Sequence, residues 1–314
     1  MIAVIILMST FFNAEGFSVF HKSARRHYKS QRSILQPHLF FTSSSTKTES
    51  SPLIDNANIV LKLKYEILQM GAALDRGQAY NPTSGQYYES KMNFAKEKIG
   101  SLIKMASSAN ANVVNSLAEI DGEWELVLST VPHGIFRSSP FFLAIQEAYA
   151  IAGAPEKAAL FFKLHELQTC SWGISKVGRV AQVINSTEGT LISEFDTSIF
   201  SLTVIPILGW FKLLPTFGGR VVTVSKAKIQ DSKILLEVDY TTARPVEGLQ
   251  GLGEFIWGFK VPVGAIWRLL PWNGGRAATA TIQIRYADAD FRVMEDSDGE
   301  LFVYSKPVFL ETSL

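Results

Sequence analysis

Two kinds of hydrophobic periodicity divide this chain. Between residues 55 and 107, apolar side chains recur at three- and four-residue spacing in two stretches, with Asn81-Pro82 and Gly85 between them. This spacing predicts two helices that form a hairpin. From about residue 120 the apolar spacing changes to two, in runs rich in β-branched and aromatic residues, and this pattern predicts β-strands. We therefore expect a mainly β chain with added helices, an α+β fold.

The period-two part of the chain contains seven runs bounded by Gly, Asn, Asp and Ser. They occupy residues 122–130, 178–184, 189–200, 218–230, 233–240, 278–294 and 300–306. Asn185–Gly189 and Asp296–Gly299 have the composition of tight turns. Seven or eight antiparallel strands with short connections predict a barrel or a sandwich. Residues 138–168, between the first two runs, predict a helical insertion that is broken at Gly153 and Pro155.

Composition and motifs exclude several classes of function. A formal net charge of +1 over 314 residues gives no electrostatic reason to expect a nucleic-acid partner. The single Cys170 excludes an internal disulfide and every zinc motif that needs paired thiolates. His165-Glu166 begins like a zinc-protease motif, but Thr169 stands where the second His is required. The chain also lacks a phosphate-binding loop and a nucleophile elbow. We therefore expect a non-enzyme with no metal, no cofactor and no catalytic residue.

The first 51 residues have the composition of targeting sequences. Residues 1–16 are an apolar run that ends in small residues, which predicts a signal peptide, although a buried strand or a membrane anchor is an alternative. Residues 17–51 hold six Lys or Arg, nine Ser and a single acidic residue, which predicts a transit peptide or a disordered basic arm. A signal peptide followed by a transit peptide resembles the leader of proteins imported into plastids bounded by extra membranes. The mature part would comprise helices over 52–110 and a barrel domain over 111–314.

Acidic residues crowd between positions 288 and 300, and three explanations compete for them. In an EF-hand alignment that uses the Asp-Gly at 298–299, Met294 and Ser305 fall on ligand positions that neither residue can fill. Asp288 and Asp290 are two apart, so on a strand they would share one face with Arg292. A catalytic pair would need to lie in a cleft. We expect instead a hairpin with one solvated face and a turn at 296–299.

Gly122-Glu-Trp124 begins the first predicted strand. A G-x-W at this place resembles the lipocalin-type barrels, in which the Trp closes one end of the barrel and a late basic side chain packs on its indole. Arg292 is the candidate partner, and a cation over a Trp face contributes on the order of 1 kcal/mol. A Trp in an ordinary strand core is the alternative.

Several segments together resemble the plastid lipid-associated protein family, also called fibrillins. They are DRG (75–77), GEWEL (122–126), GRVAQVI (178–184), LPTFGGRV (214–221), YADADFRV (286–293) and DGELFV (298–303). The last two segments are the most specific, and the resemblance runs from about residue 55 to 306. It implies a lipocalin-like barrel behind N-terminal helices, located at thylakoids or at the plastid lipid droplets called plastoglobules. It also implies binding of hydrophobic molecules such as carotenoids, quinones and galactolipid-derived lipids. The insertion at 138–168 and the Trp-rich segment at 255–272 depart from the family.

Two sets of candidate residues follow. An eight-stranded barrel has room for one small ligand, and the residues expected to line it are Trp124, Leu126, Leu128, Val180, Ile184, Phe195 and Arg292. Residues 204–217 and 255–272 are apolar, interrupted by Pro and Gly, and mixed with cations, as in segments that contact a lipid interface. The residues expected to dock there are Trp210, Phe211, Lys212, Trp257, Phe259, Lys260, Trp267, Arg268 and Trp272. Burial in the core is the alternative for the aromatic ones, and a lipid- or isoprenoid-modifying enzyme would need Asp288 or Asp290 to face the cavity.

Overall fold

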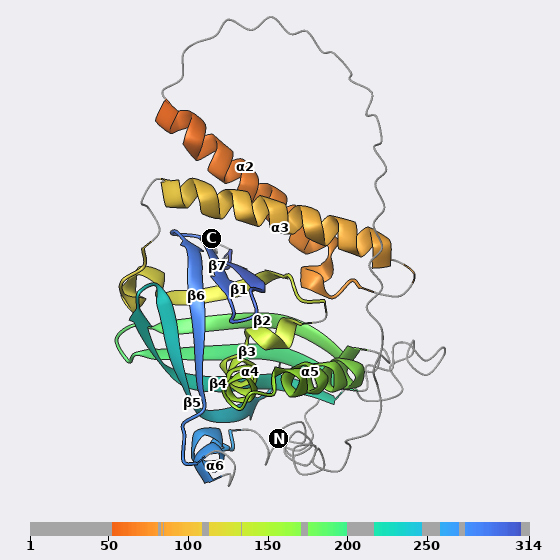
Figure 1. Ribbon diagram of the computed structural model, residues 1–314, viewed down its shortest axis with the longest axis vertical. Coiled ribbons are helices and arrows are strands. Elements are labelled where there is room, and N and C mark those ends of the chain that lie inside the picture. The colour runs from red at the N-terminus through yellow and green to blue at the C-terminus, as the bar shows by residue number, and fades with distance from the viewer. Residues whose placement is uncertain are drawn as a thin grey trace, which may run out of the picture. The chain divides into compact units, whose positions relative to one another are not determined.

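A computed structural model gives the fold of the chain (Figure 1). It describes residues 52–80, 83, 85–108, 113–132, 134–170, 175–199, 217–246, 258–269 and 274–308. The chain divides into two units, Met1–Ala57 and Asn58–Leu314, and nearly all of the described residues belong to the second unit. The predicted leader, residues 1–51, lies outside the described residues.

Eight antiparallel strands form a closed barrel in which each strand pairs with its neighbour in sequence and β8 pairs with β1. The strands are β1 (Gly122–Ser129), β2 (Ser175–Asn185), β3 (Thr190–Ile199), β4 (Phe217–Gln230), β5 (Lys233–Arg244), β6 (Thr279–Ala287), β7 (Phe291–Glu295) and β8 (Leu301–Ser305). The predicted mainly β, lipocalin-like barrel with added helices is confirmed. The run at 278–294 differs from the prediction, because it contains two strands, β6 and β7.

Strand pairing separates the inner face of the barrel from the outer face. Trp124 lies opposite Gln182, and both Leu126 and Arg292 lie opposite Tyr304. Directly opposed residues point to the same side of a sheet, and a hydrogen bond from Arg292 to Gln182 joins the two sets of residues. These five side chains are all buried and define the inner face.

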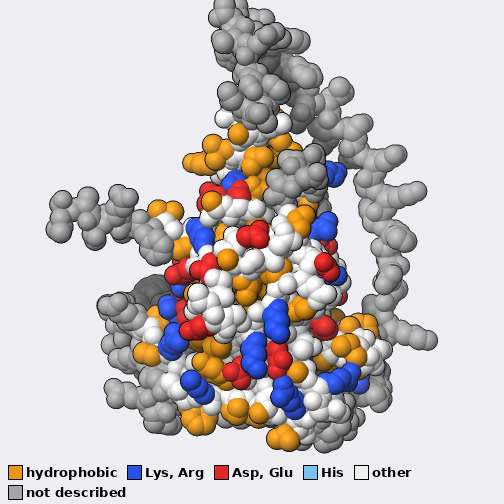
Figure 2. All heavy atoms as spheres, turned by 90° about the vertical axis from the view of Figure 1, so that its left-hand side faces the viewer, with side chains coloured by type: hydrophobic (Ala, Val, Ile, Leu, Met, Phe, Trp, Pro, Cys, Tyr) orange, Lys and Arg blue, Asp and Glu red, His pale blue; other side chains and the backbone are white. Residues whose placement is uncertain are grey.

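The outer face of β1 to β5 carries a ladder of ion pairs instead. Arg179 pairs with both Glu123 and Glu125, and Arg220 pairs with Asp196 at 2.7 Å. Figure 2 shows acidic and basic side chains interspersed over one side of the barrel. Alternation along the strands thus places apolar residues inside and charged residues outside.

Leu128 breaks this alternation. The register between β1 and β8 shifts between Leu126 and Leu128, so that Leu128 lies opposite Val303 and joins the core shared with the N-terminal helices. A bulge of this kind turns the following side chain to the other face of the sheet. The prediction that Leu128 lines the barrel interior is therefore wrong.

The N-terminal helices pack on the outside of the barrel (Figure 1). They are α2 (Pro52–Ala73) and α3 (Gly85–Ser108), joined through a 3₁₀ turn, η2 (Asp75–Gly77). Ile67 of α2 and Ile99 of α3 are fully buried in a cluster with Tyr286, Phe291 and Val293 of the β6–β7 hairpin. The helices occur where period 3.6 predicts them, because only one stripe of each is apolar enough to be buried.

Gly71 sets how closely α2 approaches β1. A Cβ added at Gly71 would lie 2.3 Å from the carbonyl oxygen of Val127, so Gly71→Ala should push the helix away and lower the free energy of unfolding by about 1–3 kcal/mol. At Gly100 in α3 an added Cβ meets nothing within 4 Å, so Gly100→Ala should be neutral or stabilise by up to about 1 kcal/mol. Urea unfolding of both variants tests this, and equal effects would contradict close helix–strand contact at Gly71.

The insertion after β1 reaches the barrel interior. It begins with a 3₁₀ turn, η4 (Ile135–Ser138), and continues as α4 (Pro140–Ile151) and α5 (Pro155–Cys170), with the predicted break at Gly153 and Pro155. Phe136 of η4 packs edge-on against Phe195 with ring centroids 5.2 Å apart, and the Ser138 carbonyl accepts a hydrogen bond from Gln182 on the inner face.

Helix α4 covers the side of β6 that β7 leaves unpaired, in a part of β6 whose other side pairs with β5. Strand β7 pairs with β6 only from Gln283 onward, and in the part before it the Thr281 amide donates to the carboxylate of Glu147 at 2.9 Å. Every residue from Pro140 to Gln146 is buried. A helix that is apolar on all sides is expected to be enclosed by the protein, and here α4 shields a strand edge that would otherwise be open.

Candidate ligand-binding interior of the barrel

Most of the predicted lining residues lie on the inner face. Trp124, Leu126, Val180 and Ile184 are each no more than 3% exposed, and Phe195 is half-buried against η4. Val180 lies opposite Phe195, which places both on the face of Gln182. The sequence therefore identified the inner face of β1 to β3, with the exception of Leu128.

Trp124 and Arg292 form the expected stack at one end of this face. The Arg292 guanidinium carbon lies 4.8 Å from the Trp124 ring centre and 4.7 Å from that of Tyr304. The indole N–H donates to the carbonyl of Ile120 at 2.8 Å, in the 3₁₀ turn η3 (Leu117–Ile120) that precedes β1. Lys306 adds a second cation, with its ammonium 4.3 Å from the Trp124 ring centre. The predicted contact between Arg292 and Trp124 is confirmed.

Arg292 itself is fully buried. Its Nη2 donates to Gln182 Oε1 at 2.8 Å, while Nε and Nη1 have no hydrogen-bond partner among the described residues. Burial lowers the pKa of Arg292 to about 10, because the charged form loses its hydration. Burial also raises the pKa of the neighbouring Tyr304 to about 12. Both groups therefore keep their protons at neutral pH, as a cation and a neutral hydroxyl.

Sequence reasoning missed the polar residues of this face, which include Gln182, Ser193 and Tyr304 beside Arg292 and the buried Thr223, Ser225 and Thr241 of β4 and β5. Gln182 lies opposite Ser193, and Tyr304 lies opposite Arg292. The hydroxyls of Ser193 and Tyr304 make no hydrogen bond of good geometry among the described residues, although the side chains of Ser138 and Gln182 lie close enough to Tyr304 to act on its pKa. Alternation offered a signal, because Gln182 falls between Val180 and Ile184 at the same period of two. The inner face thus combines apolar side chains with buried polar ones, and Ser193 and Tyr304 lie beside Gln182 and Arg292 in the strand pairing.

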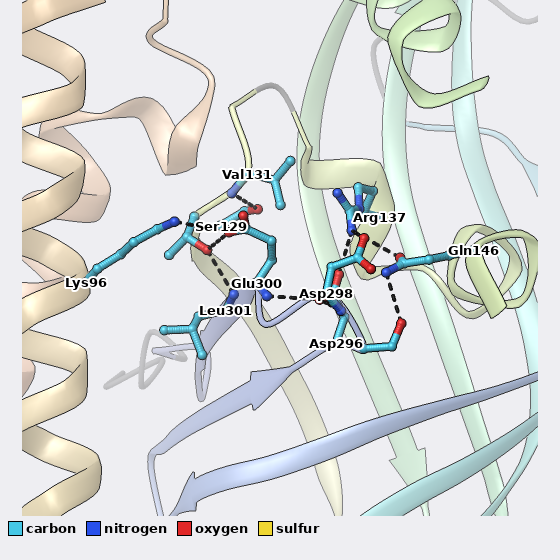
Figure 3. A network of polar contacts seen from close by, with 11 residues as sticks. Lys96, Ser129, Val131, Arg137, Gln146, Asp296, Asp298, Glu300 and Leu301 are labelled. Carbon is cyan, nitrogen blue, oxygen red and sulfur yellow. Dashed lines mark hydrogen bonds and ion pairs between the residues drawn. The ribbon is translucent and has the colours of Figure 1, made fainter. Parts of the chain in front are cut away.

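The acidic hairpin binds the surrounding elements together. The turn between β7 and β8 places Asp296 and Asp298 around Arg137 of η4, at 2.8 and 3.0 Å from its Nη2, and Gln146 of α4 accepts from the same nitrogen (Figure 3). Glu300 pairs with Lys96 of α3 at 3.3 Å. The predicted turn is present, but its carboxylates hold protein partners rather than forming a simply solvated face.

The backbone at Asp288 and Asp290 forms a turn, whereas the prediction placed both residues on a strand. They lie in the turn between β6 and β7, not on a strand beside Arg292, because Asp288 Oδ1 accepts from the amides of Asp290 and Phe291 and so closes the turn. Lys64 of α2 pairs with both carboxylates, at 2.5 and 2.6 Å. Burial acts to raise the pKa of Asp288, but hydrogen bonds from Lys64 and Tyr286 outweigh it and lower the pKa. Both carboxylates therefore lie outside the barrel interior.

A separate groove lies on the outside of the barrel, between α2 and strands β1 and β2. It has a volume of about 590 Å³, with Leu68 and Ala72 on one side and Val127 on the other. Arg76 and Arg179 border it, and both donate to protein oxygens. The groove therefore differs from the inner face, because its cations are already paired.

The predicted docking residues fall into two groups. Trp210, Phe211, Lys212, Trp257 and Trp272 lie outside the described residues. Phe259 is 58% exposed, and Arg268 is exposed and pairs with Glu237.

Trp267 and Lys260 lie next to other parts of the fold. Trp267, on α6 (Val263–Leu269), is only 6% exposed and packs edge-on against Phe141 of α4. A docking role for the Trp267 indole is therefore corrected to a core role. The Lys260 ammonium lies 4.6 Å from the ring centre of Tyr240.

Within the described residues, no group of three or more His, Cys, Asp or Glu side chains is arranged to hold a metal ion. No helix in the same part of the chain has the length and apolar character to cross a membrane. No family model, curated protein or solved structure matches the chain. The fold and site thus define a closed lipocalin-like β-barrel whose inner face carries apolar side chains together with buried polar ones such as Gln182, Thr223 and Arg292.

Proposed function

We propose that this protein binds and sequesters a hydrophobic small molecule of plastid membranes inside its barrel, without catalysing a reaction. The ligand class is that of carotenoids, quinones or galactolipid-derived lipids, and the site of action is the thylakoid or the plastoglobule. The observation that carries the proposal is the closed barrel with inward apolar side chains such as Leu126, Val180 and Ile184. An enclosed apolar surface lined from several strands suits one apolar ligand.

Two further observations support this assignment. The segments that resemble plastid lipid-associated proteins include Gly122–Leu126. The stack of Arg292 on Trp124, which the resemblance of Gly122-Glu-Trp124 to lipocalin-type barrels implies, is present at 4.8 Å. A lipid-modifying enzyme would need Asp288 or Asp290 to face the cavity, but both carboxylates are paired with Lys64. The plastid address rests on the composition of residues 1–51 and on the resemblance to plastid lipid-associated proteins.

The direct experiment is to identify what the protein retains. Purified full-length protein is incubated with a total plastid lipid extract, reisolated by gel filtration, and its bound lipids are identified by mass spectrometry. We expect one dominant lipid at about one per chain, since a closed eight-stranded barrel has room for at most one small ligand. A nonselective mixture, or no lipid, would contradict an interior site.

A matched pair of variants locates the ligand. Val180→Trp fills the inner face, whereas Val183→Trp adds the same bulk on the opposite face of the same strand, because Val183 lies opposite Glu123 of the outer ladder. We expect retained lipid to fall severalfold in the first variant and to stay unchanged in the second, with circular dichroism confirming that both are folded. Equal retention in both variants would place the ligand outside the barrel.

A second candidate function is docking to a lipid surface, alone or together with interior binding. Phe259 and Leu269 are 58% and 81% exposed, and the exposed Lys260 and Arg268 accompany them. Exposed apolar side chains beside cations favour a membrane interface. The double variant Phe259→Ser/Leu269→Ser should float less with liposomes of plastid lipids than the parent, and equal flotation would exclude this contact.

A further inference from the structure

Arg292 is a buried cation without an anionic partner. No ion pair of the described residues includes it, although the exposed and half-buried Arg179, Arg220 and Arg268 all pair with carboxylates. Two of its three nitrogens, Nε and Nη1, lack a hydrogen-bond partner within the described part of the chain. A buried charge is costly to the folded state unless it is paired and hydrogen-bonded.

The aromatic neighbours compensate for this cost only in part. Trp124 and Tyr304 attract the cation through their ring faces, at 4.8 and 4.7 Å. A ring face does not replace the hydrogen bonds that Nε and Nη1 make in water. Nε and Nη1 of Arg292 can therefore still donate to a hydrogen-bond acceptor on the inner face.

Two hydroxyl groups that can donate hydrogen bonds belong to residues beside Arg292 in the strand pairing. The Tyr304 hydroxyl belongs to the residue directly opposite Arg292, and the Ser193 hydroxyl belongs to the residue opposite Gln182, which itself binds Arg292. Neither hydroxyl makes a hydrogen bond of good geometry among the described residues, and Ser138 and Gln182 are the polar side chains next to that of Tyr304. Lys306, on the same indole as Arg292, adds positive charge at this end of the barrel.

We propose that this end of the inner face binds a carboxylate, with Arg292 as the charged partner and Tyr304 and Ser193 as hydroxyl donors. The ligand class is then a long-chain carboxylic acid, with its chain along the apolar residues of the inner face. A carboxylate neutralises the one fully buried cation, since Lys306 is only partly buried and already donates to the carbonyl of Asp121. The proposal rests on the proposed function and specifies the chemistry of its ligand.

The test compares two ligands that differ only in the head group. The affinities of hexadecanoic acid and hexadecan-1-ol are measured by their competition with the neutral dye Nile red for the full-length protein at neutral pH. We expect the acid to bind about tenfold or more tightly than the alcohol, since hydrogen bonds to a charged partner are the stronger ones. Equal affinities would overturn the carboxylate site and leave the proposed function intact, whereas binding of neither ligand would remove both.

Variants identify the residue responsible. Arg292→Met should abolish the preference for the acid while the affinity for the alcohol changes less than about threefold. Arg220→Met, the same substitution at an outer-face arginine paired with Asp196, should leave the preference unchanged. Tyr304→Phe removes one hydroxyl without removing the ring and should lower the preference severalfold, so the test holds even where Arg292→Met does not fold. A preference unchanged in Tyr304→Phe and in every folded Arg292 variant would overturn the assignment.

Discussion

Replacing Arg137 with glutamine should lower the free energy of unfolding at neutral pH by about 3 kcal/mol or more. The carboxylate of Asp296 is completely buried, and Arg137 is its charged partner at 2.8 Å. Removing one partner of a buried ion pair leaves the other charge uncompensated, which typically costs about 3–5 kcal/mol. Figure 3 shows that the same arginine holds Asp298 and Gln146, so η4, α4 and the β7–β8 turn would lose a common contact.

The loss should depend on pH in a defined direction. Burial raises the pKa of Asp296 above its ordinary value of 3.8, and the charge of Arg137 opposes that rise. In R137Q the pKa should rise further. A carboxyl with a raised folded-state pKa destabilises the fold above that pKa and ceases to do so below its unfolded pKa. Urea unfolding at pH values from neutral down to about 4 should therefore show the variant approaching the wild type.

Two controls separate this effect from a general loss of charge. Asp296→Asn in the R137Q background should recover part of the stability at neutral pH, because the buried charge is then absent. Arg268→Gln breaks the ion pair with Glu237, in which both side chains are more than one third exposed, and it should cost less than about 1 kcal/mol. A loss in R137Q as small as that in R268Q, or one independent of pH, would show that Asp296 is not held as a buried anion.

The barrel could be predicted because its strands alternate strongly. The run at 218–230 is rich in β-branched residues and alternates on either side of Ser225, and it forms a single strand although its pairing with β5 shifts between Val224 and Ser225. The pattern failed where the backbone departs from regular pairing. The shift after Leu126 turns Leu128 outward, and no side-chain pattern marks a bulge. The run at 278–294 hides a turn that Asp288 closes through its own side chain, without Gly or Pro to indicate it.

The candidate site was predicted in part, for a similar reason. The contact of Arg292 with Trp124 followed from a resemblance in sequence, whereas the second ring, Tyr304, depends on the pairing of β7 with β8. The entry of η4 into the barrel was missed as well. The run from Pro140 to Gln146 is apolar on every side of a helix, which indicates complete burial, but only tertiary structure shows that the preceding Phe136 meets the inner face.

Replacing Trp124 with alanine should also lower the free energy of unfolding by about 3–5 kcal/mol. The indole is 1% exposed, its N–H donates to Ile120, and its ring carries both Arg292 and Lys306. Trp124→Phe retains an aromatic face but loses the hydrogen bond, so its loss should be clearly smaller. Tyr65→Ala, on the exposed side of α2 with 64% of the residue exposed, serves as a control and should change stability by less than about 0.5 kcal/mol.

A double-mutant cycle then separates the cation contact from the loss of volume. Arg292→Met alone removes the cation, and the pair Trp124→Phe and Arg292→Met should show little coupling, because Phe still offers a ring face. The pair Trp124→Ala and Arg292→Met should show a coupling energy of about 1–2 kcal/mol, since the guanidinium in Trp124→Ala stays buried without that ring. Urea unfolding of the single and double variants gives both values. Zero coupling with alanine would mean that Trp124 fills space at this end of the barrel while Tyr304 and Gln182 alone hold the charge.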